Sequence, residues 1–142
     1  MSSETSNERV ELTIPATVEW LVLARTTGAA VASRWSFTYD EIADLRLAID
    51  ELCLTLVEGP NAERIELTYS LTEEALSVEG RTVLAKPGAS AASDSGATGD
   101  FTLSAELSGR ILDALVDEHG IRDGAGEGAK TAWLRKKRSA LS

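Results

Sequence analysis

Apolar residues near the start of the chain change from a two-residue spacing to a helical spacing. The segment Val10 to Ile14 reads Val-Glu-Leu-Thr-Ile, and this alternation predicts a short strand with one buried face that ends at Pro15. A helix should follow from a Thr17 cap to about Arg34, because apolar residues then recur at helical intervals. The chain is therefore expected to begin with a strand and a helix.

A second helix is the most regular pattern in the sequence. Thr38 or Asp40 can cap it, and it should continue to Val57 before Gly59-Pro60-Asn61 ends it. Its apolar stripe consists of Ile42, Leu45, Ile49, Leu52 and Leu56. Polar residues occupy another side, so one side of this helix should face a sheet and another should face water.

The middle of the chain predicts an antiparallel hairpin followed by a loop. Strand patterns cover Arg64 to Leu71 and Ala75 to Glu79, and the polar turn Thr72-Glu73-Glu74 separates them. Residues Lys86 to Asp100 are small and polar and cannot bury much apolar surface, so we interpret this segment as a flexible loop.

The last third predicts one helix and two strands. Residues Leu103 to Glu118 again follow the helical period, with a stop at Gly120. A short strand around Ile121 and a final strand from Ala129 to Arg135 should be joined by the turn Asp123 to Gly128. The order β-α-α-β-β-loop-α-β-β predicts an α+β fold, with a mixed, mainly antiparallel sheet and three helices on one face.

Length and charge limit the organisation and the partners. A chain of 142 residues with 43% hydrophobic residues suits one domain, expected over residues 9–138 between a disordered N-terminus at 1–8 and a tail at 139–142. The net charge of -9 argues against direct binding to nucleic acid or to an anionic membrane and favours a basic partner. The basic run Arg135 to Arg138 is interpreted as a solvated end after a strand.

Cysteine and histidine counts exclude several kinds of chemistry. Cys53 and His119 are the single cysteine and the single histidine, so an intramolecular disulfide and a multi-histidine metal site are impossible. Cys53 lies in an apolar helix pattern, where a thiol is usually a small buried hydrophobe and not a nucleophile. With no secretory signal at Met1 to Arg9 and no apolar run of about 18 residues, the expected location is the cytoplasm.

The stretch Ile42 to Cys53, together with the order of elements, resembles the anti-sigma factor serine kinases of the GHKL ATPase superfamily. The resemblance implies a two-layer α/β sandwich in which one helix carries a general-base Glu and, four residues later, a magnesium-binding Asn. Glu51 has the Glu position, but Thr55 has the Asn position. A threonine hydroxyl is shorter than a carboxamide and a poorer ligand for magnesium.

The other nucleotide motifs of that family are also altered. Where the family has an adenine-binding Asp in an Asp-x-Gly-x-Gly motif, this chain reads Val78-Glu79-Gly80-Arg81, so Glu79 and Gly80 form at most a degenerate nucleotide site. The 86–100 loop replaces the family's glycine-rich ATP lid and contains no phosphate-cradling motif. We therefore expect no cofactor, with ATP and magnesium bound only if the family site is retained, and Glu51 is a vestigial base.

The resemblance extends from about residue 9 to 138 and implies partners. In the family the first helix presents an arginine to a bound sigma factor, and the sequence Leu23-Ala24-Arg25 places that residue at Arg25. Segments Leu112 to Glu118 and Gly128 to Arg138 resemble the third helix and the last strand. The family also dimerises through its sheet side, which implies a homodimer.

Three functions remain open from the sequence. The leading one is a stress-response anti-sigma factor that sequesters an alternative sigma factor by direct binding and is released by an anti-anti-sigma partner of the STAS type. The alternatives are an active ATP-dependent serine kinase of that anti-anti-sigma factor and a sensor-kinase-like ATPase fragment. Loss of the Asn and Asp motifs favours a protein that is not an enzyme.

Overall fold

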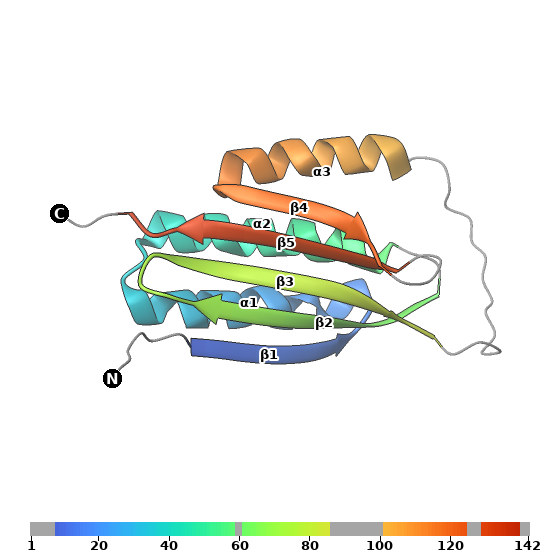
Figure 1. Cartoon of the computed structure of the whole chain (residues 1–142), viewed down its shortest axis with the longest axis horizontal. Helices are drawn as coiled ribbons and strands as arrows, with labels where there is room; N and C mark the ends of the chain where they lie inside the picture. The colour runs from blue at the N-terminus through green and yellow to red at the C-terminus, as the bar shows by residue number, and fades with distance from the viewer. Residues whose placement is uncertain (1–7, 59–60, 86–100, 125–128, 140–142) are drawn as a thin grey trace.

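The computed structural model describes residues 8–58, 61–85, 101–124 and 129–139, with only the backbone for residues 101–105. Five strands form one sheet in the order β1-β2-β3-β5-β4, and every neighbouring pair is antiparallel. The three α-helices lie on one face of this sheet, with α1 behind β2 and β3 and α2 behind β5 in Figure 1. The α+β class, the element order and the two-layer arrangement predicted from the sequence are therefore confirmed, but the five described strands are all antiparallel and the sheet is not mixed.

The strands and α-helices have the following bounds: β1 Glu8–Pro15, α1 Leu21–Ala32, α2 Tyr39–Val57, β2 Ala62–Leu71, β3 Ala75–Leu84, α3 Phe101–Leu115, β4 Glu118–Asp123 and β5 Lys130–Lys137. Glu8, expected in the N-terminal extension, is the first residue of β1. The predicted loop at 86–100 and most of the predicted turn before β5 lie outside the described residues. Within the described residues, no helix combines the length and apolar character that a membrane span requires.

Helix α2 begins at the predicted cap and ends at the predicted residue. The Thr38 hydroxyl accepts a hydrogen bond from the Glu41 N–H (3.1 Å), and the Thr38 N–H donates to the Glu41 carboxylate (2.8 Å). This reciprocal capping box satisfies two backbone donors that the first turn would leave open. The predicted apolar stripe is buried at Leu45, Ile49, Leu52 and Leu56.

The prediction of one continuous helix from Thr17 to Arg34 is wrong at both ends. A 3-10 turn at Val18–Trp20 precedes α1, a second at Ser33–Trp35 follows it, and Thr17 makes no side-chain cap. The buried Tyr69 hydroxyl donates to the Ala24 carbonyl (2.7 Å), which fixes α1 on the sheet. Burial raises the pKa of Tyr69, so its phenol remains a donor.

Strand β3 is longer than predicted and continues past Glu79 to Leu84. Val78, Gly80 and Thr82 face the helices, whereas Glu79 and Arg81 face the open side of the sheet. The Thr82 hydroxyl donates to the last turn of α2 at the Leu56 carbonyl (3.2 Å), a buried contact. This contact explains why a polar residue is accommodated beneath the helix layer.

Helix α3 ends at Leu115, three residues before the predicted end. Glu118 pairs instead with Arg135 as the first residue of β4. The Lys136 ammonium donates to the Leu115 carbonyl at the end of α3 (2.9 Å) and lies 3.6 Å from the Asp44 carboxylate of α2. With a side chain only 15% exposed, Lys136 is a bridge between layers, so the interpretation of this basic run as a solvated end is wrong for this residue.

The C-terminal residues connect the sheet to the start of α2. Arg138 donates from its guanidinium to the Glu73 carbonyl in the β2–β3 turn (2.9 Å). Ser139 donates from its N–H to the Glu41 carboxylate (2.9 Å) and also from its hydroxyl. Burial raises the pKa of Glu41, but the hydrogen bonds from Ser139 and Thr38 outweigh it and leave that pKa below its ordinary value.

Candidate functional site

The two sides of α2 that flank its buried stripe carry the candidate functional residues. On the side toward α3 the structure brings together Glu51, Thr55 and Ser108. On the side toward α1 it pairs Arg25 with Asp50. Consecutive residues 50 and 51 thus serve different surfaces, because successive positions on a helix are separated by about 100°.

Glu51, the expected position of the general base, is held by a residue of the third helix. The Ser108 hydroxyl donates to a carboxylate oxygen of Glu51 at 2.6 Å, in a partly buried contact between α2 and α3. A short hydrogen bond to a carboxylate is stronger than a neutral one, and it fixes the orientation of the Glu51 side chain. Glu51 is therefore used to join two helices in this structure.

Thr55 lies one turn after Glu51 and is directed at its own helix. Its hydroxyl donates to the Glu51 backbone carbonyl at 3.3 Å, the common i−4 bond of a helical threonine. The hydroxyl proton is thus committed to the backbone. The site has neither the length nor the carbonyl oxygen of the family's carboxamide.

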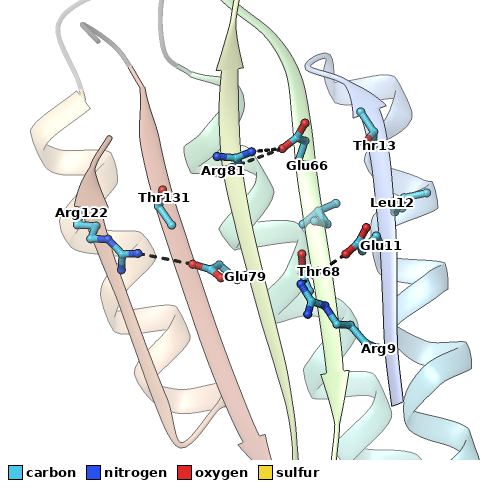
Figure 2. A pocket seen from close by; sticks show the side chains of 11 residues that line it. Arg9, Glu11, Leu12, Thr13, Glu66, Thr68, Glu79, Arg81, Arg122 and Thr131 are labelled. Carbon is cyan, nitrogen blue, oxygen red and sulfur yellow. Dashed lines mark hydrogen bonds and ion pairs between the residues drawn. The ribbon is translucent and has the colours of Figure 1, made fainter. Parts of the chain in front are cut away.

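Glu79 and Gly80 are adjacent in sequence but lie on opposite faces of the sheet. Figure 2 shows Glu79 on the open face, where it lies 3.6 Å from the Arg122 guanidinium. Gly80 faces α2, and a Cβ there would meet Leu56 at 2.7 Å and Leu67 at 3.0 Å. The structure therefore brings Glu51 and Thr55 together but places Glu79 on the other side of the sheet, and leucines fill the space beside Gly80.

A small cavity lies between α2, α3 and the β4–β5 edge. Its volume is about 100 Å³, and it is lined by Leu52, Thr55, Ser108, Gly109, Leu112, His119, Gly120, Ile121, Ala132 and Trp133. Drug-sized ligands occupy pockets of about 300 Å³ or more. At this size the cavity formed by the described residues does not fit a nucleoside triphosphate.

Two acidic residues near the end of α2, Glu51 and Glu58, influence each other's charge, and Lys130 offsets part of that effect. Burial raises the pKa of Glu58, Lys130 lowers it, and the neighbouring charge of Glu51 raises it again, for a net rise. Within the described ranges, no group of three or more His, Cys, Asp or Glu residues could hold a metal ion.

Arg25 is held in place by a residue that the sequence analysis did not select. Its Nη1 atom donates to both carboxylate oxygens of Asp50, at 3.0 and 3.3 Å. The two side chains are 33% and 31% exposed, so the guanidinium is partly buried and not a freely solvated surface group. Asp50 therefore orients Arg25 while leaving part of the guanidinium at the surface.

Cys53 and His119 do not form a catalytic pair. Cys53 is completely buried, and burial followed by the negative charge of Asp50 raises the pKa of its thiol to about 12. His119 Nε2 lies 2.7 Å from an Asp113 carboxylate oxygen, a contact that joins β4 to α3. The thiol is therefore a packing group, as its place in the apolar pattern indicated.

The fold is an α+β sandwich of the GHKL type. No family model matches the chain. It is similar to "Serine-protein kinase RsbW" of Bacillus cereus strains B4264 and G9842 and of Bacillus thuringiensis strain Al Hakam. Each relative is 36% identical over 74 residues, which cover 50% of this chain and 46% of the relative. The resemblance to RsbW-like proteins is confirmed, although the match spans only about half the length of these curated relatives.

The sequence did not indicate the residues that bind Glu51 and Arg25 from other helices. Ser108 lies 57 positions from Glu51, and Asp50 lies 25 positions from Arg25. No local spacing connects such pairs, although Asp50 stands directly before Glu51 in the stretch that carried the resemblance.

Gly80→Ala should destabilise the protein by about 1–3 kcal/mol, because the new methyl group would overlap two leucines in a closed core. Gly109→Ala is the matched control: no atom lies within 4 Å of a Cβ there, and replacing glycine in a helix should stabilise by about 0.5–1 kcal/mol. Urea denaturation of both variants measures the two changes. An unchanged stability for Gly80→Ala would show that the helix layer does not close over β3.

Proposed function

We propose that this protein is an anti-sigma factor that sequesters an alternative sigma factor by direct binding, without ATP chemistry. The observation that carries the proposal is the contrast between the two sides of α2. Arg25, at the family's sigma-binding position, is held at the surface by Asp50, whereas Glu51 is bound by Ser108 beside a cavity of about 100 Å³. This contrast supports binding of a protein partner over ATP chemistry.

Release of the sigma factor would then depend on competition. An anti-anti-sigma protein of the STAS type that binds the same surface would displace the sigma factor by mass action, without phosphoryl transfer by this chain. This partner switching, in a cytoplasmic stress response, is the setting that the resemblance implies. It requires only that the two partners cannot bind at the same time.

An ATP-dependent serine kinase is the second candidate. Its support is the printed name of the relatives, "Serine-protein kinase RsbW", and the presence of Glu51 at the family's base position. Against it stand Thr55 in place of the carboxamide and Glu79 on the open face of the sheet. Phosphoryl transfer requires a positioned metal–nucleotide complex, and this sequence has Thr55 and Glu79 where the resemblance implies the Asn and Asp that would hold one.

Arg25→Ala should weaken sigma binding by about 2 kcal/mol, roughly thirtyfold in affinity, if the guanidinium pairs with a sigma carboxylate in a desolvated contact. The cost in folding should remain below about 1 kcal/mol, because the Asp50 pair is partly exposed. Binding is measured by co-purification against the host's sigma factors at low salt, followed by titration. Arg34→Ala is the control, since it removes another ion-paired arginine, in the 3-10 turn that follows α1.

Two outcomes of that experiment would contradict the proposal. One is that the wild-type protein retains no sigma factor at low salt. The other is that Arg34→Ala weakens binding as much as Arg25→Ala does. Association should also slow as salt rises, because a protein of net charge -9 attracts a basic partner over long range.

Incubation with labelled ATP and a candidate anti-anti-sigma protein should give no phosphorylated partner. The physical reason is that Glu51 already accepts the Ser108 hydrogen bond and no described residue replaces the missing magnesium ligand. Calorimetric titration with Mg-ATP provides an independent reading. Transfer of label to a partner serine that disappears in Glu51→Ala would establish the kinase instead.

A homodimer is proposed from the family resemblance, through the sheet side. The helices α1 and α2 lie behind the sheet in Figure 1, and Figure 2 shows that the opposite face carries charges of both signs, including the pairs Arg81–Glu66 and Arg122–Glu79. A two-fold interface can match such charges in trans. Sedimentation at micromolar concentration should show a dimer, and a single monomeric species at all concentrations would remove the proposal.

A further inference from the structure

The outer surface of the helix layer carries a groove between α1 and α2. Its volume is about 460 Å³. Tyr39, Ile42, Ala43, Arg46 and Leu47 of α2 form most of its lining, together with the Arg25–Asp50 pair. It lies on the helix layer, away from the sheet face shown in Figure 2. The cavity beside Glu51 lies instead on the α3 side of α2.

The groove exposes large apolar side chains on one side of one helix. Tyr39 is 86% exposed and Leu47 is 58% exposed. From Tyr39 to Asp50 the groove residues follow about three turns of α2, a length of roughly 16 Å. Exposed apolar residues at helical spacing, bordered by charges, are typical of a surface that receives the apolar face of a partner helix.

The charges that border the groove are mainly positive, in contrast to the protein as a whole. Arg46 is exposed and forms no hydrogen bond or ion pair within the part of the chain that the structure describes. Arg25 uses only Nη1 toward Asp50, which leaves its Nε–Nη2 edge without a partner among the same residues. Two guanidinium groups and one carboxylate thus make a local positive site on a chain with net charge -9.

We infer that this groove binds one amphipathic helix of a partner protein, with apolar side chains on Tyr39 and Leu47 and a carboxylate between Arg25 and Arg46. The Nε–Nη2 edge of an arginine matches the two oxygens of a carboxylate, so this contact would set the register of the helix. A basic helix would bring like charges against both arginines. The occupant is therefore acidic at the centre of its apolar face.

This inference rests on the proposed function only in assigning the surface to a protein partner. It adds Tyr39, Arg46 and Leu47 to the single contact at Arg25 and specifies the chemistry of the bound segment. It also gives Asp50 a role as a positioning residue, since its carboxylate holds Arg25 in the lining of the groove. The partner need not be a sigma factor for the groove to act in this way.

Site-specific crosslinking of the full chain in the cells from which its gene comes tests the inference. The change Tyr39→p-benzoylphenylalanine places a photoreactive group in the groove, and Leu107→p-benzoylphenylalanine is the control at another exposed apolar residue, on α3. Mass spectrometry of the crosslinked peptide should identify an amphipathic helical segment with a central Asp or Glu. A basic segment, a second copy of this chain, or a yield equal to that of the control would overturn the inference.

A synthetic peptide with the identified sequence then tests the charge contact. Arg46→Gln should weaken its binding about tenfold, and replacing the central acid of the peptide by its amide should cause no further loss in that variant. Arg110→Gln, which removes an exposed arginine from α3, should leave the affinity unchanged. Equal binding by wild type and Arg46→Gln would contradict the proposed contact.

The outcomes separate the groove from the proposed function. If the captured acidic helix comes from a protein that is neither a sigma factor nor an anti-anti-sigma factor, and the wild-type chain retains no sigma factor, the groove inference stands and the anti-sigma proposal fails. If a sigma factor binds the chain but Tyr39→Ala and Arg46→Gln leave its affinity unchanged, the anti-sigma proposal stands and the groove inference fails.

Discussion

Burial of one face of α2 against the sheet is the contact on which the rest of the structure depends. Leu45, Ile49, Leu52 and Leu56 are 0–1% exposed, and they fix the rotation of the helix about its axis. Gly80 in β3 and Gly28 in α1 have no side chain where α2 approaches them, so the helix can pack closely on both. Once that rotation is set, Asp50 must face α1 and Glu51 must face α3.

The parts of the fold that were predictable are those set by local periodicity. The α2 cap, its last residue and the order of elements follow from spacing and from turn residues alone. Element ends that depend on distant residues were not predictable. Helix α3 ends where Lys136 reaches the Leu115 carbonyl and where Glu118 pairs with Arg135, and neither contact has a local sequence signal.

The same distinction applies to the candidate site. Glu51 and Thr55 were assigned to one side of a helix because they are four residues apart, and the structure places both there. The face on which Glu79 lies was also predictable from local sequence, because side chains alternate along a strand and Val78 beside it is apolar. The family motif places a nucleotide-binding residue at this position and gives no information about the face. Ser108 and Asp50 required the tertiary arrangement, because each meets its partner across two helices.

The hydrogen bonds that the residues after β5 make to the first turn of α2 have a mechanical consequence. Arg138 holds the β2–β3 turn and Ser139 holds Glu41, so the chain end passes from the sheet layer to the helix layer at the first turn of α2. A load applied at Ser139 therefore acts on Glu41 through these hydrogen bonds. Since Glu41 lies two residues from Tyr39, anything attached to that terminus pulls on the same turn of helix that forms one end of the outer groove.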